Sequence, residues 1–122
     1  MFFPVCIDIE NKKCLVIGGG KIAYKKIKTL SRYNSDITVI AEEIKEEKIR
    51  EIGNIDIREK RFSDENLREY MLVVAATDDK ELNEEIAEFC IRNNTLVKNV
   101  TSKNQMNVRF GAILEDEDYQ IL

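Results

Sequence analysis

The stretch that decides the fold reads Cys14-Leu15-Val16-Ile17-Gly18-Gly19-Gly20-Lys21-Ile22-Ala23. Its apolar first half is typical of a buried strand. After the three glycines, apolar residues resume at helical spacing, at Ile22, Ala23, Ile27 and Leu30. The pattern therefore predicts a strand, a tight turn and the first turn of a helix.

The glycines also form a G-x-G-x-x-A motif at Gly18, Gly20 and Ala23. In such a motif Gly18 permits the sharp turn, and Gly20 lets a pyrophosphate approach the bare backbone. Ala23 lets the helix lie close to the strand, and the free N–H groups of the helix face the phosphates. A glycine turn without a ligand is the alternative, but the strand before it and the helix after it favour a dinucleotide site.

Composition limits the class of protein. The chain has 122 residues, of which 43% are hydrophobic and 34% charged, as expected of one globular domain. Its net charge of −4 speaks against nucleic acid as the main partner. Its apolar runs are far shorter than the roughly 20 residues that cross a bilayer, and no signal peptide opens the chain. We therefore expect a cytoplasmic protein without a membrane partner.

Cysteine and histidine usage limits the chemistry. Cys6, Cys14 and Cys90 are odd in number and far apart, which favours reduced core residues over a disulfide framework or a zinc site. The chain has no histidine, the commonest general base and metal ligand. Acid–base steps must then use carboxylates, hydroxyls, lysines or water, and we expect no metal site made by the protein.

Strand and helix patterns alternate along the chain. Strands are predicted at residues 3–9, 14–17, 37–40, 55–57, 71–76, 96–100, 110–114 and 119–122, and helices at 21–32, 42–52, 63–70 and from Asp78, capped with Glu81, to about 92. This order predicts one α/β domain over 1–122, a Rossmann-like doubly wound, mostly parallel sheet. The first strand, with Pro4, would be an added edge strand, and the last two a C-terminal pair. Because the chain ends on residues typical of mid-strand, we expect it to be part of a longer protein.

A ligand of such a sheet lies at the carboxyl ends of the strands, where strand order reverses. The loops there are residues 18–20, 41–43, 77–79 and 99–103. The small Ala75 and Ala76 leave room for a cofactor, although they are also typical of close-packed sheet positions.

Recognition of the adenosine ribose falls to the second of these loops. Glu42 or Glu43 can accept hydrogen bonds from the ribose hydroxyls, or either can be a first-turn residue favoured by a helix dipole. No arginine is nearby in the sequence to hold a 2′-phosphate, so NAD is favoured over NADP.

Several motifs occur together in a fixed order. They are Phe3-Pro4-Val5 with Asp8, the glycine motif followed by Tyr24-Lys25-Lys26, Thr38-Val39-Ile40-Ala41-Glu42, Ala75-Ala76-Thr77-Asp78-Asp79-Lys80-Glu81-Leu82-Asn83, and Asn99-Val100. In these the sequence resembles the dehydrogenase/ferrochelatase module of sirohaem synthase and its stand-alone precorrin-2 dehydrogenase relatives. The resemblance implies NAD-dependent oxidation of precorrin-2 to sirohydrochlorin, with iron insertion in some members. It also implies a helical dimerisation region after this domain, and hence a homodimer of the full-length protein.

The resemblance also implies roles for single residues. Gly18, Gly20 and Ile22 would line the pyrophosphate, Ala41 and Glu42 the adenosine, and Thr77, Asp78 and Asn99 the nicotinamide side. Lys21 would contact phosphate or a substrate carboxylate, or be a solvated surface lysine.

The substrate side departs from the family pattern, because Ser102 aligns with an aspartate assigned to both activities. A serine is a poor base without a partner, so Asp78 and Asp79 are the nearest acidic candidates. Hydride transfer needs no protein base in its first event, so dehydrogenation is better supported than iron insertion. Lys103 and Arg109 are candidates for substrate carboxylates, although Arg109 can instead pair with the acidic stretch 115–118.

A second class of function is a non-catalytic, NAD(H)-binding regulatory domain, such as those attached to potassium channels. Length and fold suit it. The A-A-T-D-D-x-x-L-N block argues against it.

Overall fold

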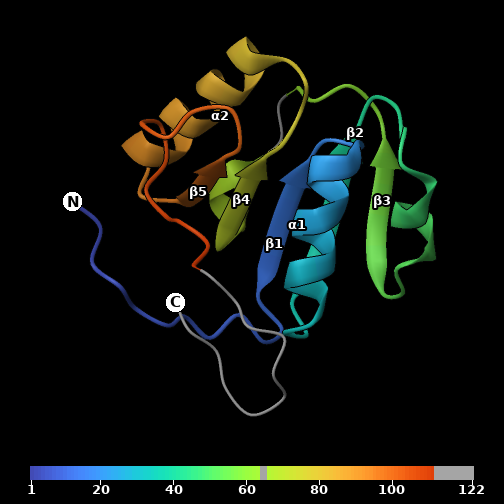
Figure 1. Ribbon diagram of the computed structural model, residues 1–122, viewed down its shortest axis with the longest axis horizontal. Coiled ribbons are helices and arrows are strands. Elements are labelled where there is room, and N and C mark those ends of the chain that lie inside the picture. The colour runs from blue at the N-terminus through green and yellow to red at the C-terminus, as the bar shows by residue number, and fades with distance from the viewer. Residues whose placement is uncertain (64–65, 112–122) are drawn as a thin grey trace.

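The computed structural model describes residues 1–63 and 66–111, and its centre is a five-stranded parallel sheet in the order β3-β2-β1-β4-β5 (Figure 1). The strands are β1 (Lys13–Ile17), β2 (Asp36–Ala41), β3 (Ile55–Glu59), β4 (Leu72–Ala75) and β5 (Leu96–Asn99). β1 pairs with both β2 and β4, so strand order reverses between β1 and β4. The predicted Rossmann-like α/β fold is confirmed.

Helix α1 (Lys21–Ser31) and helix α2 (Lys80–Arg92) cover opposite faces of the sheet. Alternate residues of β1 separate the two faces: Val16 belongs to the core beneath α1, and Leu15 to the core beneath α2. Both side chains are fully buried, as expected of a central parallel strand.

The buried thiols follow the same division. Cys14 packs beneath α1 and Cys90 beneath α2, whereas Cys6 is exposed, and all three are free. Burial raises the pKa of both buried thiols to about 11. The predicted core positions of Cys14 and Cys90 are confirmed.

The strand predicted at residues 3–9 is wrong, because the chain runs there as an irregular segment outside the sheet (Figure 1). Val5 and Ile7 remain 55% and 40% exposed, and Ile9 packs against the core only in part. A strand needs a neighbour to accept its hydrogen bonds, and within the described part of the chain no sheet edge pairs with this segment. The strands predicted at 110–114 and 119–122 fall almost wholly outside the described residues.

The helix predicted at 42–52 is also wrong in its first half, and only the 3₁₀ helix η1 (Glu47–Glu51) forms. The backbone N–H groups of Lys45 and Glu46 both donate to the carbonyl of Gly19, at 2.9 Å. Residues 42–46 are therefore tied to the glycine turn and cannot continue a helix.

Two further boundaries differ from the prediction. The short helix expected at 63–70 is reduced to the 3₁₀ helix η2 (Leu67–Glu69), whose cap is Asn66. Helix α2 is capped by Asp79 rather than Asp78: its carboxylate accepts from the N–H groups of Glu81 and Leu82, at 3.1 and 3.2 Å. Within residues 1–63 and 66–111, no helix has the length and apolarity to cross a membrane.

Candidate functional site

The glycine turn is packed tightly on two sides and open on the third. Gly18 has a φ of +140°, and a Cβ placed on it would lie 2.2 Å from the carbonyl oxygen of Ala76. A Cβ on Gly19 would lie 2.3 Å from the carbonyl oxygen of Glu43, whereas one on Gly20 would meet nothing within 4 Å. Gly18 and Gly19 thus hold the turn against the neighbouring loops, and Gly20 leaves its backbone accessible.

Gly20 is also the N-cap of α1, and it makes no side-chain hydrogen bond to the first turn. That turn contains no acidic residue, and Lys21 begins it. The uncapped N–H groups and the positive end of the helix dipole therefore face open space, which is the arrangement that binds a phosphate.

A cavity of about 880 Å³ lies in front of this turn, at the carboxyl ends of β1 to β4. Its size suits a cofactor-sized ligand. It brings together eight of the residues predicted for the cofactor: Gly18, Gly20, Lys21, Ile22, Ala41, Glu42, Thr77 and Asp78. Ile22 supplies an apolar wall, because its side chain is 53% exposed despite its place in the motif.

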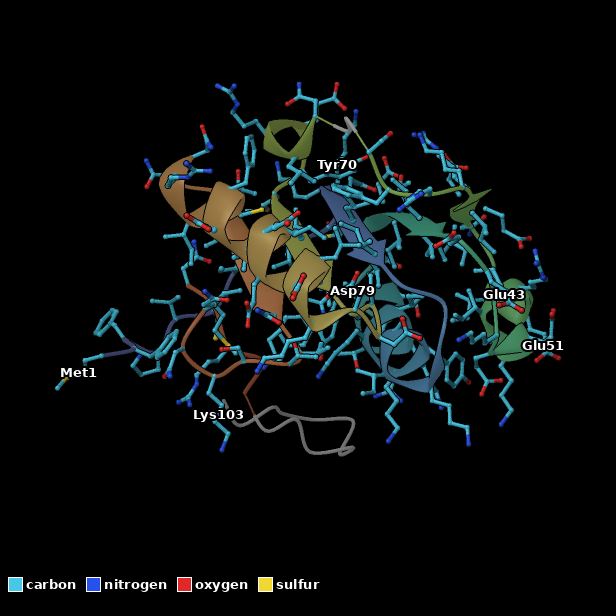
Figure 2. All side chains as sticks on the ribbon, turned by 90° about the horizontal axis from the view of Figure 1, so that it is seen from above. Met1, Glu43, Glu51, Tyr70, Asp79 and Lys103 are labelled. Carbon is cyan, nitrogen blue, oxygen red and sulfur yellow. The ribbon has the colours of Figure 1, made fainter. Side chains whose placement is uncertain are left out.

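The remaining predicted site residues, Asn99, Ser102, Lys103 and Arg109, do not line this cavity. Asn99 is fully buried, and its side-chain oxygen accepts from the N–H and the hydroxyl of Thr101, each at 3.0 Å. Ser102 is half-buried, and its hydroxyl accepts from the N–H of Asn104 at 3.3 Å. In Figure 2 Asp79 lies between Lys103 and Glu43, and of these three only Asp79 and Glu43 line the cavity.

The loop after β4 is held by a buried asparagine of α2. The side-chain oxygen of Asn83 accepts from the N–H of Thr77 at 3.1 Å and from its hydroxyl at 2.6 Å. The side-chain nitrogen donates to the Thr77 carbonyl at 3.0 Å and to the Thr101 hydroxyl at 3.3 Å. One side chain thereby fixes the loop after β4 and links it to the loop after β5. The sequence signal was the Asn at the end of the A-A-T-D-D-x-x-L-N block.

The cavity wall also contains cations that the sequence motifs did not indicate. Lys60 and Arg61, which follow β3, line the cavity, and the N–H of Lys60 donates to the Ala41 carbonyl at 2.9 Å. The expectation that no arginine is near the loop after β2 is therefore wrong, because Arg61 lines the same cavity as Ala41 and Glu42. It failed because the end of β3 comes beside the end of β2 only through the sheet order.

Lys45 was missed as well. Its ammonium group lies 3.3 Å from a carboxylate oxygen of Asp78, and both residues line the cavity. The two side chains are 63% and 87% exposed. This ion pair links the loop after β2 to the loop after β4.

A second group of cations, Lys26, Lys98 and Arg109, lies around Lys98 of β5. Lys26 is 5.2 Å from the centre of the Phe110 ring, and Arg109 is 4.8 Å from that of Phe2. Burial lowers the pKa of Lys98, and the charges of Lys26 and Arg109 lower it further. Like charges gathered in this way favour an anionic partner.

No group of three or more Cys, Asp or Glu side chains in the described part of the chain is arranged to hold a metal ion. The glycine turn does fit a dinucleotide, because Gly20 leaves open space in front of an uncapped helix. Fold and site together define a Rossmann-like dinucleotide-binding domain.

The chain belongs to a family described as putative NAD(P)-binding, whose model matches residues 5–112. It is 32% identical over 122 residues to a sirohaem synthase of Actinobacillus succinogenes, covering 98% of this chain and 26% of that protein. It is 38% identical over 116 residues to a sirohaem synthase of Ruthia magnifica, covering 93% of this chain and 25% of that protein. The chain thus spans about a quarter of the length of these relatives.

Among solved structures it is similar to SirC, a precorrin-2 dehydrogenase, with a TM-score of 0.83 and 26% identity. This match covers 98% of the chain and 60% of SirC. The resemblance to the sirohaem synthase module is thereby confirmed.

Proposed function

We propose that this chain is the cofactor-binding part of an NAD-dependent precorrin-2 dehydrogenase, which produces sirohydrochlorin for sirohaem biosynthesis. The observation that carries the proposal is the open backbone at Gly20, set before an uncapped helix in a cavity of about 880 Å³. The similarity to SirC over nearly the whole chain supports the choice of reaction.

In this proposal each loop of the cavity has a separate task. Gly18, Gly20, Lys21 and Ile22 hold the pyrophosphate, Ala41 and Glu42 the adenosine, and Thr77 the nicotinamide side. NAD⁺ supplies the hydride acceptor. The network around Asn83 keeps Thr77 fixed, so that the redox ring meets a rigid wall.

The proton that leaves the substrate needs an acceptor. Asp78 is the better placed of the two catalytic candidates, because it lines the cavity and its side chain is exposed. Ser102 lies outside the cavity lining, so we assign it the orientation of substrate rather than proton transfer. Asn99, buried below the loop after β5, would support that loop instead of touching the nicotinamide.

The substrate carries many carboxylates, and the cations beside β5 suit them. Arg109 and Lys103 are exposed, and Arg109 adds its charge to those of Lys26 and Lys98. Arginine can bind a carboxylate through two parallel hydrogen bonds. We therefore place the substrate between the cavity and this group of cations.

The deciding experiment mixes the full-length polypeptide that contains this chain with precorrin-2 and NAD⁺ and follows NADH absorbance. Turnover supports the proposal. NAD binding by calorimetry with a flat absorbance trace would instead support a non-catalytic, NAD(H)-sensing domain.

We also propose a cytoplasmic location and a homodimer of the full-length protein. The free thiols Cys6, Cys14 and Cys90 suit a reducing compartment. The helical region that the sequence resemblance implies after this domain would make the subunit contact. Sedimentation equilibrium should show a dimer for the full-length protein and a monomer for residues 1–122.

A further inference from the structure

One ion pair spans the cavity in front of the glycine turn. The ammonium group of Lys45 lies 3.3 Å from the carboxylate of Asp78, and the cavity lined by both residues also contains Gly20 and Lys21. Both partners are mostly exposed, and an exposed pair contributes little free energy, typically below about 1 kcal/mol. The pair can therefore be exchanged at small cost when a stronger anion enters.

The backbone of each partner is anchored to the glycine turn. The N–H of Lys45 donates to the Gly19 carbonyl at 2.9 Å, and Gly19 has no room for a side chain beside Glu43. On the other side, the carbonyl of Ala76 lies against Gly18, two residues before Asp78. A flexible lysine side chain thus starts from a fixed point beside the phosphate cradle.

Acidic and basic side chains both line the cavity around Lys45. The lining contains more acidic than basic residues, namely Glu42, Glu43, Asp78, Asp79, Glu81 and Glu85 against Lys21, Lys45, Lys60 and Arg61. A diphosphate bound at the head of α1 would bring a concentrated negative charge close to the Lys45 backbone. Hydrogen bonds from an ammonium group to phosphate oxygens are charge-assisted, as is the ion pair with Asp78. The diphosphate carries more negative charge than the single Asp78 carboxylate and is therefore the stronger partner.

We propose that Lys45 exchanges its ion pair with Asp78 for the dinucleotide diphosphate, so that cofactor binding frees the Asp78 carboxylate in the cavity. The second half rests on the proposed function, since a free carboxylate beside the nicotinamide loop is the proton acceptor assigned above. Lys45 is thus a cofactor-binding residue outside the glycine motif. In the free protein its ammonium group binds the Asp78 carboxylate, which competes with the diphosphate for this lysine.

The test measures binding of ADP and of adenosine by calorimetry. The variants are Lys45→Met and Asp78→Asn, and Lys48→Met is the matched control, because Lys48 is an exposed lysine three residues further on that does not line the cavity. Lys45→Met should weaken ADP binding about tenfold and leave adenosine binding unchanged. Lys48→Met should bind both ligands as the wild type does. Asp78→Asn should bind ADP as tightly as the wild type or more tightly.

Three results would overturn the exchange. Wild-type affinity of Lys45→Met for ADP would mean that this lysine does not meet the diphosphate. Weakening by Asp78→Asn equal to that by Lys45→Met would mean that the ion pair persists and acts as a unit. Neither measurement uses precorrin-2, so a failure of the proposed reaction remains distinguishable from a failure of this inference. A wild-type chain that binds no ADP would overturn the exchange together with the cofactor site.

Discussion

Three consecutive glycines serve the site in three different ways. Gly18 combines a positive φ with contact to the Ala76 carbonyl, so it needs both the freedom and the small size of glycine. Gly19 has only the size requirement, set by the Glu43 carbonyl. In the free protein Gly20 has neither the conformational nor the size requirement. Its lack of a side chain affects only the binding of a ligand.

This difference predicts opposite defects at two positions. Gly18→Ala should lower the free energy of unfolding by roughly 2–4 kcal/mol, because strain at positive φ adds to a clash with backbone. Gly20→Asp should stay within about 1 kcal/mol of the wild type yet lose NAD binding, because its carboxylate takes the place of phosphate. Urea unfolding and calorimetry measure the two effects. NAD affinity retained by Gly20→Asp would mean that the diphosphate lies elsewhere.

The two buried thiols predict how stability depends on alkaline pH. Burial raises the pKa of Cys14 and Cys90 from 9.0 to about 11, so between these pH values the unfolded chain loses thiol protons that the folded chain keeps. Their contribution to stability is complete below pH 9 and falls by at most about 1.4 kcal/mol per pH unit for each thiol as the pH rises towards 11. Urea unfolding at pH 8.5 to 10.5 should therefore show a steeper decline for the wild type than for Cys14→Ala/Cys90→Ala. The control Cys6→Ala, at an exposed position, should decline as the wild type does.

At the scale of the elements, sequence patterns predicted the buried strands and long helices well, because burial on one or both faces gives a clear periodicity. They failed for η1, where Ile44, Ile49 and Ile52 have helical spacing but the Gly19 carbonyl takes the N–H groups that a helix would need. They failed also at residues 3–9, where alternation is present but no neighbouring strand pairs with it. Both failures concern tertiary hydrogen bonds, which local sequence does not encode.

The cap of α2 gives a prediction at this scale, with adjacent aspartates as test and control. Asp79→Ala removes the acceptor for two N–H groups of the first turn and should lower the free energy of unfolding by about 1 kcal/mol. Asp78→Ala removes only an exposed ion pair and should cost less than about 0.5 kcal/mol. Equal losses in urea unfolding would contradict the assignment of the cap to Asp79.

At the scale of the whole molecule, the site exists only because four strands end at one edge of the sheet. The sequence motifs named the loops after β1, β2 and β4, but the loop after β3 joins them through the strand order β3-β2-β1-β4. That order places Lys60 and Arg61 on the cavity wall, and the spacing of residues along the chain does not indicate this position. Ser102 shows the converse, since the family pattern aligned it with a catalytic residue, yet it does not line the cavity.

Because the cavity joins loops from most of the sheet, a bound dinucleotide should stabilise the whole fold. A ligand that binds only the folded state at 100 times its Kd adds about 2.7 kcal/mol, which for a domain of this size raises Tm by roughly 10 °C. NAD⁺ or ADP should produce this shift in the wild type, whereas adenosine, lacking the diphosphate, should produce a smaller one at equal concentration. Gly20→Asp should unfold near the wild-type temperature and show no shift with either nucleotide, since its cradle is blocked while its core is intact. A nucleotide-dependent rise in the Tm of Gly20→Asp would place the binding site outside the glycine turn, and scanning calorimetry at several NAD⁺ concentrations decides between the two outcomes.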